Sequence, residues 1–342
     1  MTSVERVNNA YEFKPVDKVP LEYHPSTAGL YEHGDKLRKL FKSLEGDFED
    51  YTDIDIKIPG PDDFDADGKY HVFKTDDWGV IWEEKIYGVS GYTHSSPLSD
   101  ISKIKNYKAP PSRFSGANLK QTKNHILSVR KKGKFTKYYV PGLFERMIAI
   151  RGFEDTLADL YDDTHEINRL ADIITEYCSN EINAFINADV DCINFGDDYG
   201  TQIDLILSRK IFKRFFMPRY KRLMAPVKKA GIKIHFHSCG FVWDLLEDFK
   251  EMGADSIWPQ LSVYDLNEFS RKLRDLKLAA ALHIDRAGVM TKGKPDDVKN
   301  AINTYVNVFR PYEGGSWFYV EIDNDFPYEN IETLIGEIKK YR

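Results

Sequence analysis

The sequence predicts an α/β barrel whose site lies at the carboxyl ends of its parallel strands. From about residue 135 onward, short apolar segments alternate with longer amphipathic ones. The strand candidates are Lys137–Pro141, Asp191–Phe195, Lys233–His237, Asp255–Trp258, Leu278–Ile284 and Trp317–Ile322. The helix candidates are Glu166–Phe185, Ile211–Lys229, Val242–Glu251, Asp265–Leu273, Pro295–Phe309 and Tyr328–Tyr341. Strands and helices that alternate at this spacing form parallel sheets with helical crossovers.

The first 130 residues are less regular, and we expect them to contain the first strand and a lid-like hairpin. The expected elements are a strand at Val19–Tyr23, a helix at Tyr31–Leu44, and two β segments at Tyr70–Thr75 and Gly79–Glu83. This part has too few apolar residues for a core of its own. We therefore predict one barrel domain over residues 1–342, with regular β/α repeats over residues 131–342 and the hairpin as an excursion over one end.

Composition narrows the class of protein. A formal net charge of −6 argues against nucleic acid or an anionic membrane as the main partner. Three scattered cysteines indicate a reducing compartment, and the amino terminus lacks the apolar run of a signal peptide. No apolar stretch is long enough to span a membrane. The sequence also lacks the glycine-rich loops that bind dinucleotides or triphosphates, so we expect a cytoplasmic enzyme of another kind.

The segment from Gly231 to Gly240, GIKIHFHSCG, contains the strongest chemical signal. Side chains alternate along a strand, so His235 and His237 share one face, which we expect to point into the barrel. Enzymes with this fold keep their chemistry at the carboxyl ends of the strands, where His237 is followed closely by Cys239. Imidazole and thiolate together are a favoured zinc ligand pair. The alternative is a buried histidine beside an inert cysteine.

Other polar groups follow neighbouring strands. Asp197 and Asp198 follow the strand at 191–195 and could bind a cation or carry a proton, although a solvated turn is the alternative. His283, Asp285 and Arg286 lie at the end of another strand. In the last strand Glu321 shares a face with Trp317 and Tyr319, which predicts that its carboxylate points inward. A salt bridge to Arg286 is the alternative role for Glu321.

Several motifs in the same order resemble those of the uroporphyrinogen decarboxylase superfamily. They are Thr75–Asp76–Asp77–Trp78–Gly79, Leu143–Phe144–Glu145–Arg146, Arg151–Gly152–Phe153, Gly196–Asp197–Asp198–Tyr199–Gly200–Thr201–Gln202, His237–Ser238–Cys239–Gly240, Gly253–Ala254–Asp255, Ile284–Asp285, Gly314–Gly315 and Pro327–Tyr328–Glu329–Asn330–Ile331. The superfamily contains decarboxylases of the haem pathway and zinc-dependent methyltransferases that serve corrinoid proteins. The resemblance implies a (β/α)8 barrel.

The methyltransferase branch resembles this chain better than the decarboxylases do. The decarboxylases grip a polyanionic substrate with arginines near the amino terminus, but the matching stretch Val19–Tyr31 has none. The resemblance to the methyltransferases implies zinc held by His237 and Cys239. Their third ligand is a cysteine, and Glu321 takes its place in this chain. A carboxylate is an acceptable zinc ligand and would leave the metal a stronger Lewis acid.

From this resemblance we expect a methyltransferase that moves a methyl group from a small O-methyl aromatic compound to a corrinoid (cobalamin) protein. The predicted ligands of the zinc are His237, Cys239 and Glu321. The predicted catalytic residues are Asp197, Asp198, Glu145, Asp285 and His283. The predicted substrate-binding residues are Tyr23, His24, Trp78, Tyr199, His235 and Arg286. The resemblance is compatible with a homodimer.

Two alternatives stay open at this point. The first is a metal-independent decarboxylase or lyase on the same barrel, in which Asp198 and His283 deliver the proton. The second is a binding protein that has kept the barrel but lost the metal and the catalytic activity. Metal content separates the methyltransferase from both alternatives.

Overall fold

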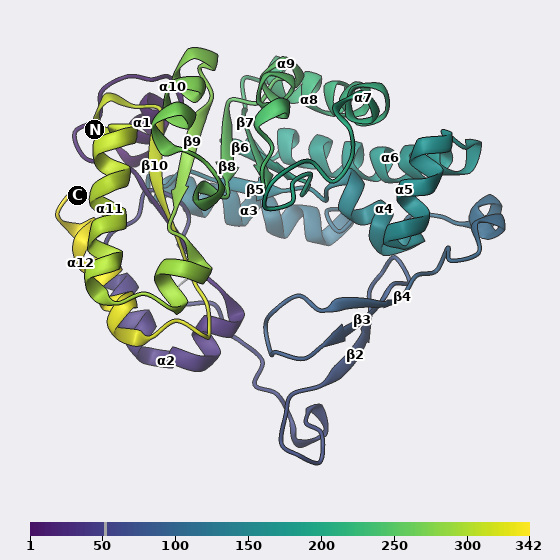
Figure 1. Cartoon of the computed structure of the whole chain (residues 1–342), viewed down its shortest axis with the longest axis horizontal. Helices are drawn as coiled ribbons and strands as arrows, with labels where there is room; N and C mark the ends of the chain where they lie inside the picture. The colour runs from purple at the N-terminus through teal and green to yellow at the C-terminus, as the bar shows by residue number, and fades with distance from the viewer. Residues whose placement is uncertain (51–52) are drawn as a thin grey trace.

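Seven parallel strands form the central sheet in a computed structural model of the chain, which describes residues 1–50 and 53–342 (Figure 1). The strands lie in the order β1, β10, β9, β8, β7, β6, β5. Their bounds are β1 Leu21–Pro25, β5 Lys137–Tyr139, β6 Cys192–Gly196, β7 Lys233–Ser238, β8 Ser256–Pro259, β9 Ala279–His283 and β10 Ser316–Ile322. Each strand predicted from the apolar segments is present, within two residues at each end. The prediction of an α/β barrel is confirmed.

A short segment around Phe48 closes the ring between the two edge strands. The Asp47 amide donates to the Leu21 carbonyl of β1 over 2.8 Å. On the other side Phe48 forms a parallel bridge with Phe135, just before β5, and the Glu49 amide donates to the Phe135 carbonyl over 3.1 Å. This segment takes the place of an eighth strand. It was not predicted, because it is too short to show an alternating pattern.

Helices cover the outside of the barrel (Figure 1). Their bounds are α2 Thr27–Lys42, α3 Gly116–Lys131, α4 Leu143–Arg151, α5 Phe153–Asp162, α6 His165–Asn187, α7 Arg209–Ile211, α8 Met217–Lys229, α9 Leu246–Met252, α10 Leu266–Leu276, α11 Pro295–Phe309 and α12 Tyr328–Lys339. The predicted helix 211–229 is divided by a π-helical turn at Phe212–Phe216. None of the described helices is long and apolar enough to cross a membrane.

Helix α1 (Ser3–Tyr11), which was not predicted, closes the amino-terminal end of the barrel. Val7, Ala10 and Tyr11 are buried against residues at the starts of strands, including Cys192 and Trp317. Burial of this helix seals the barrel opposite the carboxyl ends of the strands. Access to the interior is therefore left to the carboxyl-terminal end.

The excursion is a three-stranded antiparallel sheet made of β2 (Val72–Thr75), β3 (Ile81–Glu84) and β4 (Tyr92–Ser95). It projects from the barrel in Figure 1. The prediction contained only the first two strands, because β4 is exposed along its whole length and has no apolar face. An ion pair of 2.7 Å between Arg146 and Asp76 ties the sheet to α4.

Candidate active site

Strand β7 presents its two faces as its alternating sequence predicts. Ile234 and Phe236 are fully buried in the layer between sheet and helices, and Phe236 contacts Phe249 of α9 with ring centres 4.6 Å apart. His235 and His237 lie on the opposite face, inside the barrel. His237 is the nearer of the two to the carboxyl end of the strand.

The tautomer of His237 is set by β8. Its Nδ1 lies 2.9 Å from the backbone carbonyl oxygen of Trp258, which can only accept, so Nδ1 carries the proton. The Nε2 lone pair is left for a metal or a proton. Burial lowers the pKa of His237, which keeps the imidazole neutral. A backbone carbonyl on the far nitrogen is the usual orienting contact of a metal-ligating histidine.

Asp198, His237 and Cys239 form a group with the geometry of metal ligands. The His237 Nε2 atom lies 3.4 Å from Asp198 Oδ1 and 3.5 Å from Cys239 Sγ. Their ligand atoms all lie within 4.8 Å of one another, and no other such group of three or more histidine, cysteine and acidic residues occurs within residues 1–50 and 53–342. Burial, with the charge of Asp198, raises the pKa of the Cys239 thiol to about 12 when no cation is bound.

Two glycines bring Asp198 to Cys239. A Cβ on Gly240 would lie 2.2 Å from the carbonyl oxygen of Gly200, and Gly240 has a φ of +78°. The loops after β6 and β7 therefore touch backbone to backbone at this point. The Gly200 amide donates to the Cys239 carbonyl over 3.2 Å, and the Cys239 amide donates to Asp198 Oδ1 over 2.8 Å. A side chain at position 200 or 240 would push the two loops apart, so both positions require glycine.

Asp197 is turned away from this group and fully buried. Its carboxylate accepts from the backbone amides of Phe144 (2.8 Å) and Glu145 (2.9 Å) at the start of α4. It also accepts from the hydroxyls of Tyr199, at 3.0 Å, and Tyr220. Burial raises the pKa of Asp197 to about 6, against these hydrogen bonds, which lower it. These contacts position α4 and the loop after β6. The catalytic role expected for Asp197 stays a prediction.

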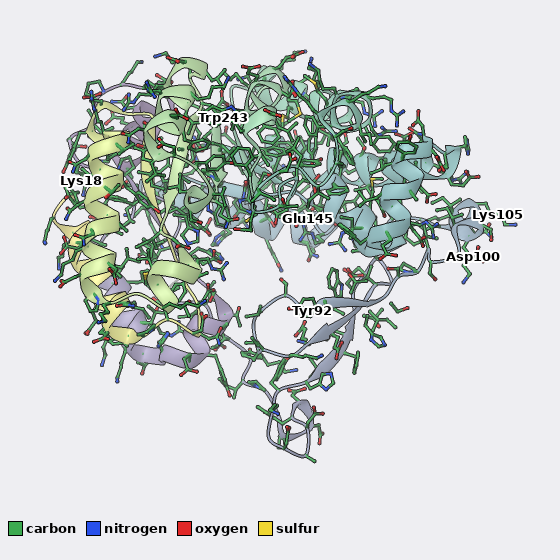
Figure 2. All side chains as sticks on the ribbon, in the orientation of Figure 1. Lys18, Tyr92, Asp100, Lys105, Glu145 and Trp243 are labelled. Carbon is green, nitrogen blue, oxygen red and sulfur yellow. The ribbon has the colours of Figure 1, made fainter. Side chains whose placement is uncertain are left out.

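Glu145 lies on the first turn of α4, at the end of the barrel that faces the three-stranded sheet (Figure 2). Desolvation, with the charges of Asp197 and Asp198, raises the pKa of Glu145 to about 8. A carboxyl group with such a pKa can carry a proton near neutral pH.

Glu321, predicted as the third zinc ligand, lies outside the ligand group. Its strand β10 pairs with β1 and β9, whereas His237 is on β7. The sequence predicted correctly that Glu321 is on the inward face, but inward residues of different strands need not meet. Burial, with the charge of Asp323, raises the pKa of Glu321 to about 7. Arg286, the alternative partner of Glu321, forms its ion pair with Asp323.

Two cavities lie at the carboxyl end of the barrel, and Trp258 lines both. One, of about 280 Å³, adjoins the ligand group and is lined by His237, Cys239, Trp258, Pro259, Gln260, Leu261, Ser262, His283, Ile284, Asp285, Arg286 and Ala287. We call it the outer cavity. The other, of about 300 Å³, is lined by Glu22, Tyr23, His24, Phe48, Glu49, Lys137, Tyr138, Tyr139, Asn194, Trp258 and Tyr319. We call it the inner cavity.

The predicted substrate-binding residues fall in different places. His24 and Tyr23 border the inner cavity, although the Tyr23 ring stacks on Phe41 at 4.7 Å. Arg286 borders the outer cavity. Trp78 and Tyr199 are buried, line neither cavity and pack against protein.

His235 is also buried, and its Nδ1 lies 2.6 Å from the Ser256 hydroxyl. It lines neither cavity.

Two features of the site escaped prediction from sequence. Trp258 orients His237 through its backbone carbonyl, its ring lies tilted against the imidazole with centres 4.1 Å apart, and it lines both cavities. The sequence shows only an aromatic residue near a strand end. In the inner cavity Lys137 and Glu22 form a buried ion pair. Both side chains are at inward positions of their strands. The alternation of side chains along each strand predicts that both point into the barrel, but it does not predict that they meet.

The family model for uroporphyrinogen decarboxylase (URO-D) matches residues 142–341, which is more than half of the chain. The chain belongs to the uroporphyrinogen decarboxylase family. The matched region contains Asp198, His237 and Cys239, so the ligand group lies in the part of the chain that the family shares.

The fold is shared with a solved structure. A methyltransferase from Methanosarcina mazei superposes with a TM-score of 0.70 at 14% sequence identity, covering 100% of this chain and 99% of that one. A B12-independent methionine synthase from Shewanella sp. W3-18-1 has a TM-score of 0.44 at 12% identity, covering 80% of this chain and 73% of that one. No curated protein matches the sequence.

Proposed function

We propose that this family member is a zinc-dependent methyltransferase that takes a methyl group from a small O-methyl aromatic compound and passes it to a corrinoid protein. The observation that carries the proposal is the ligand group of Asp198, His237 and Cys239 beside the outer cavity. The fold shared with the Methanosarcina mazei methyltransferase is consistent with it.

The donor set fits zinc. Imidazole, thiolate and carboxylate are all zinc ligands, and three protein ligands leave a position open, as in catalytic sites. Asp198 replaces the earlier expectation of Glu321 in this set. Bound there, zinc would act as a Lewis acid toward the heteroatom that loses its methyl group.

The residues of the chain have separate tasks in this proposal. The backbone carbonyl of Trp258 holds His237 in the tautomer that leaves Nε2 available. The Cys239 amide orients Asp198. Glu145, whose pKa is raised to about 8, would supply or take up a proton in the reaction. Trp258 and Leu261 line the outer cavity and would give an aromatic substrate apolar surface.

The charges of the cavities argue against a tetrapyrrole with many carboxylates as substrate. Among the residues that line the two cavities, the one arginine is Arg286 of the outer cavity. It already pairs with Asp323. Lys137 in the inner cavity pairs with Glu22. No cluster of unpaired cations is present among these lining residues, so a polyanion would lack its charge complement. We expect the protein to leave uroporphyrinogen unchanged.

Methyl transfer to free cob(I)alamin tests the proposal. Zinc-loaded protein is incubated with a panel of methoxybenzenes, and methylcobalamin is followed by absorbance. We expect transfer from at least one donor and a loss of at least about 100-fold in His237→Ala. His165→Ala, an exposed histidine at the start of α6 outside both cavities, is the matched control and should keep the rate. Decarboxylation of uroporphyrinogen at an ordinary enzymatic rate would contradict the proposal.

A further inference from the structure

His283, at the end of β9, combines burial with a polar atom that has no partner. Its side chain lines the outer cavity together with His237 and Cys239, and the residue is 8% exposed. Its Nε2 atom is buried and makes no hydrogen bond. A buried polar atom without a hydrogen-bond partner destabilises the folded protein unless a ligand supplies the partner.

The tautomer of His283 is determined by its other nitrogen. The indole Nε1–H of Trp258 donates to His283 Nδ1 over 3.3 Å. Indole nitrogen is a donor only, so Nδ1 must be the accepting, unprotonated nitrogen. In the neutral ring the proton is therefore on Nε2. The unpartnered atom is an N–H donor.

The ring stays neutral and fixed in place. Burial, with the charge of Arg286, lowers the pKa of His283 to about 3. The ring of Tyr319 meets it edge to face with ring centres 5.1 Å apart, which restricts its rotation. A neutral imidazole with an occupied acceptor nitrogen cannot deliver or remove a proton readily. It is suited to donate a hydrogen bond.

We propose that His283 donates its Nε2–H to the oxygen of the methyl donor and selects oxygen donors over quaternary ammonium donors. This inference rests on the proposed function. When the methyl–oxygen bond breaks, its electron pair stays on the oxygen, and the methyl carbon bonds to the cobalt(I) of the reduced corrinoid partner, which supplies the new electron pair. The N–H donor stabilises the charge that develops on oxygen. A quaternary ammonium has no lone pair to accept the bond, so it gains nothing from His283.

The tautomer is tested on metal-free protein, independently of any activity. Protein labelled with ¹⁵N at histidine is examined by long-range ¹H–¹⁵N correlation between pH 5 and pH 8. We expect the His283 signal, assigned by its loss in His283→Gln, to show the Nε2–H tautomer without titration. Trp258→Phe should mix the two tautomers, because the indole donor is gone. A wild-type signal of the Nδ1–H tautomer, or of a titrating ring, would overturn the inference.

The selection is tested by methyl transfer to cob(I)alamin from methoxybenzenes and from tetramethylammonium. We expect wild type to use the oxygen donors and not the ammonium. His283→Leu should lower kcat for oxygen donors by about 100-fold. His283→Gln, which keeps an N–H donor, should recover most of it. Full activity of His283→Leu, or a preference for tetramethylammonium, would overturn the inference. A lack of methyl transfer from every compound tested would overturn the proposed function. The tautomer measurement would then still show whether His283 Nε2 is a hydrogen-bond donor.

Discussion

Asp197 and Asp198 are neighbours in the sequence, yet they belong to two different regions of the molecule. Asp197 lies in a buried cluster under α4, where two amides and two tyrosine hydroxyls donate to it. Asp198 is at the mouth of the barrel, within reach of His237 Nε2 and with 38% of its side chain exposed. A single peptide step therefore separates a carboxylate that holds the fold from one that can bind a ligand.

The two carboxylates differ in whether their hydrogen-bonding capacity is used up by other protein atoms. The hydrogen bonds of the Asp197 cluster are directed at other protein atoms, so the cluster contributes stability. The groups around the outer cavity keep atoms without protein partners, as His283 Nε2 does. Unpartnered atoms beside a cavity indicate ligand binding, whereas complete pairing indicates structure.

The largest expected effect separates the two carboxylates by stability. Asp197→Asn removes the charge that four donors share and leaves at least one buried donor poorly paired. We expect the free energy of unfolding, measured with urea, to fall by about 3 kcal/mol. Asp198→Asn is the matched control and should change it by no more than about 0.5 kcal/mol. Equal losses in the two variants would remove the distinction between the regions.

A second substitution tests the contact between the two loops. Gly240→Ala places a methyl group against the Gly200 backbone at a φ of +78°, so the loops must separate. We expect a loss of about 2 kcal/mol in stability, from the left-handed backbone and the clash. Gly231→Ala, at a φ of +73° with open space around it, isolates the cost of the backbone conformation alone. If both variants lose the same amount, the loops do not depend on close contact.

A smaller effect is expected inside the Asp197 cluster. Tyr220→Phe removes one hydroxyl donor to Asp197 while the ring remains in place. We expect a loss of about 1 kcal/mol. Tyr305→Phe is a matched control, because Tyr305 is buried on α11 away from this cluster. A Tyr220→Phe variant as stable as wild type would show that the cluster tolerates an incomplete set of donors.

A pH-dependent effect on stability is expected from Glu321. Its pKa is raised from 4.5 to about 7, so the folded protein keeps a proton that the unfolded chain has lost between these pH values. Stability from this group is present at low pH and falls as pH rises through that window. In metal-free protein, Glu321→Gln should be more stable than wild type at pH 8 by up to about 3 kcal/mol, and equal to it near pH 4. A variant less stable than wild type at pH 8 would show that the Glu321 carboxylate is stabilised by a cation.

Much of the fold was predictable from sequence because its signals are local. Apolar strands such as Lys233–Ser238 and the helix Pro295–Phe309 have patterns that depend on a few neighbouring residues. The closing segment at Phe48 was missed because its contact with the distant Phe135 defines it. Helix α1 was missed although Thr2 and Glu5, which form a capping box at its start, are a local signal.

The candidate site was predictable only in part, for the same reason. The pairing of His237 with Cys239 follows from their spacing in one strand end, so the sequence contained it. The third member depends on which loop touches that strand end, and the Gly200–Gly240 contact brings Asp198 there. Glu321 was predicted from the alternation of its strand, which gives the face but not the neighbour across the barrel.

The most direct measurement of the central claim is zinc affinity, determined by competition with a chromogenic chelator on protein purified without metal. Wild type should bind one zinc ion per chain. Asp198→Asn should weaken binding by at least about 100-fold, which corresponds to about 2.8 kcal/mol. Glu321→Gln should stay within about threefold of wild type. The opposite pattern, with Glu321→Gln losing zinc and Asp198→Asn retaining it, would contradict this account, as would wild-type protein that binds no zinc.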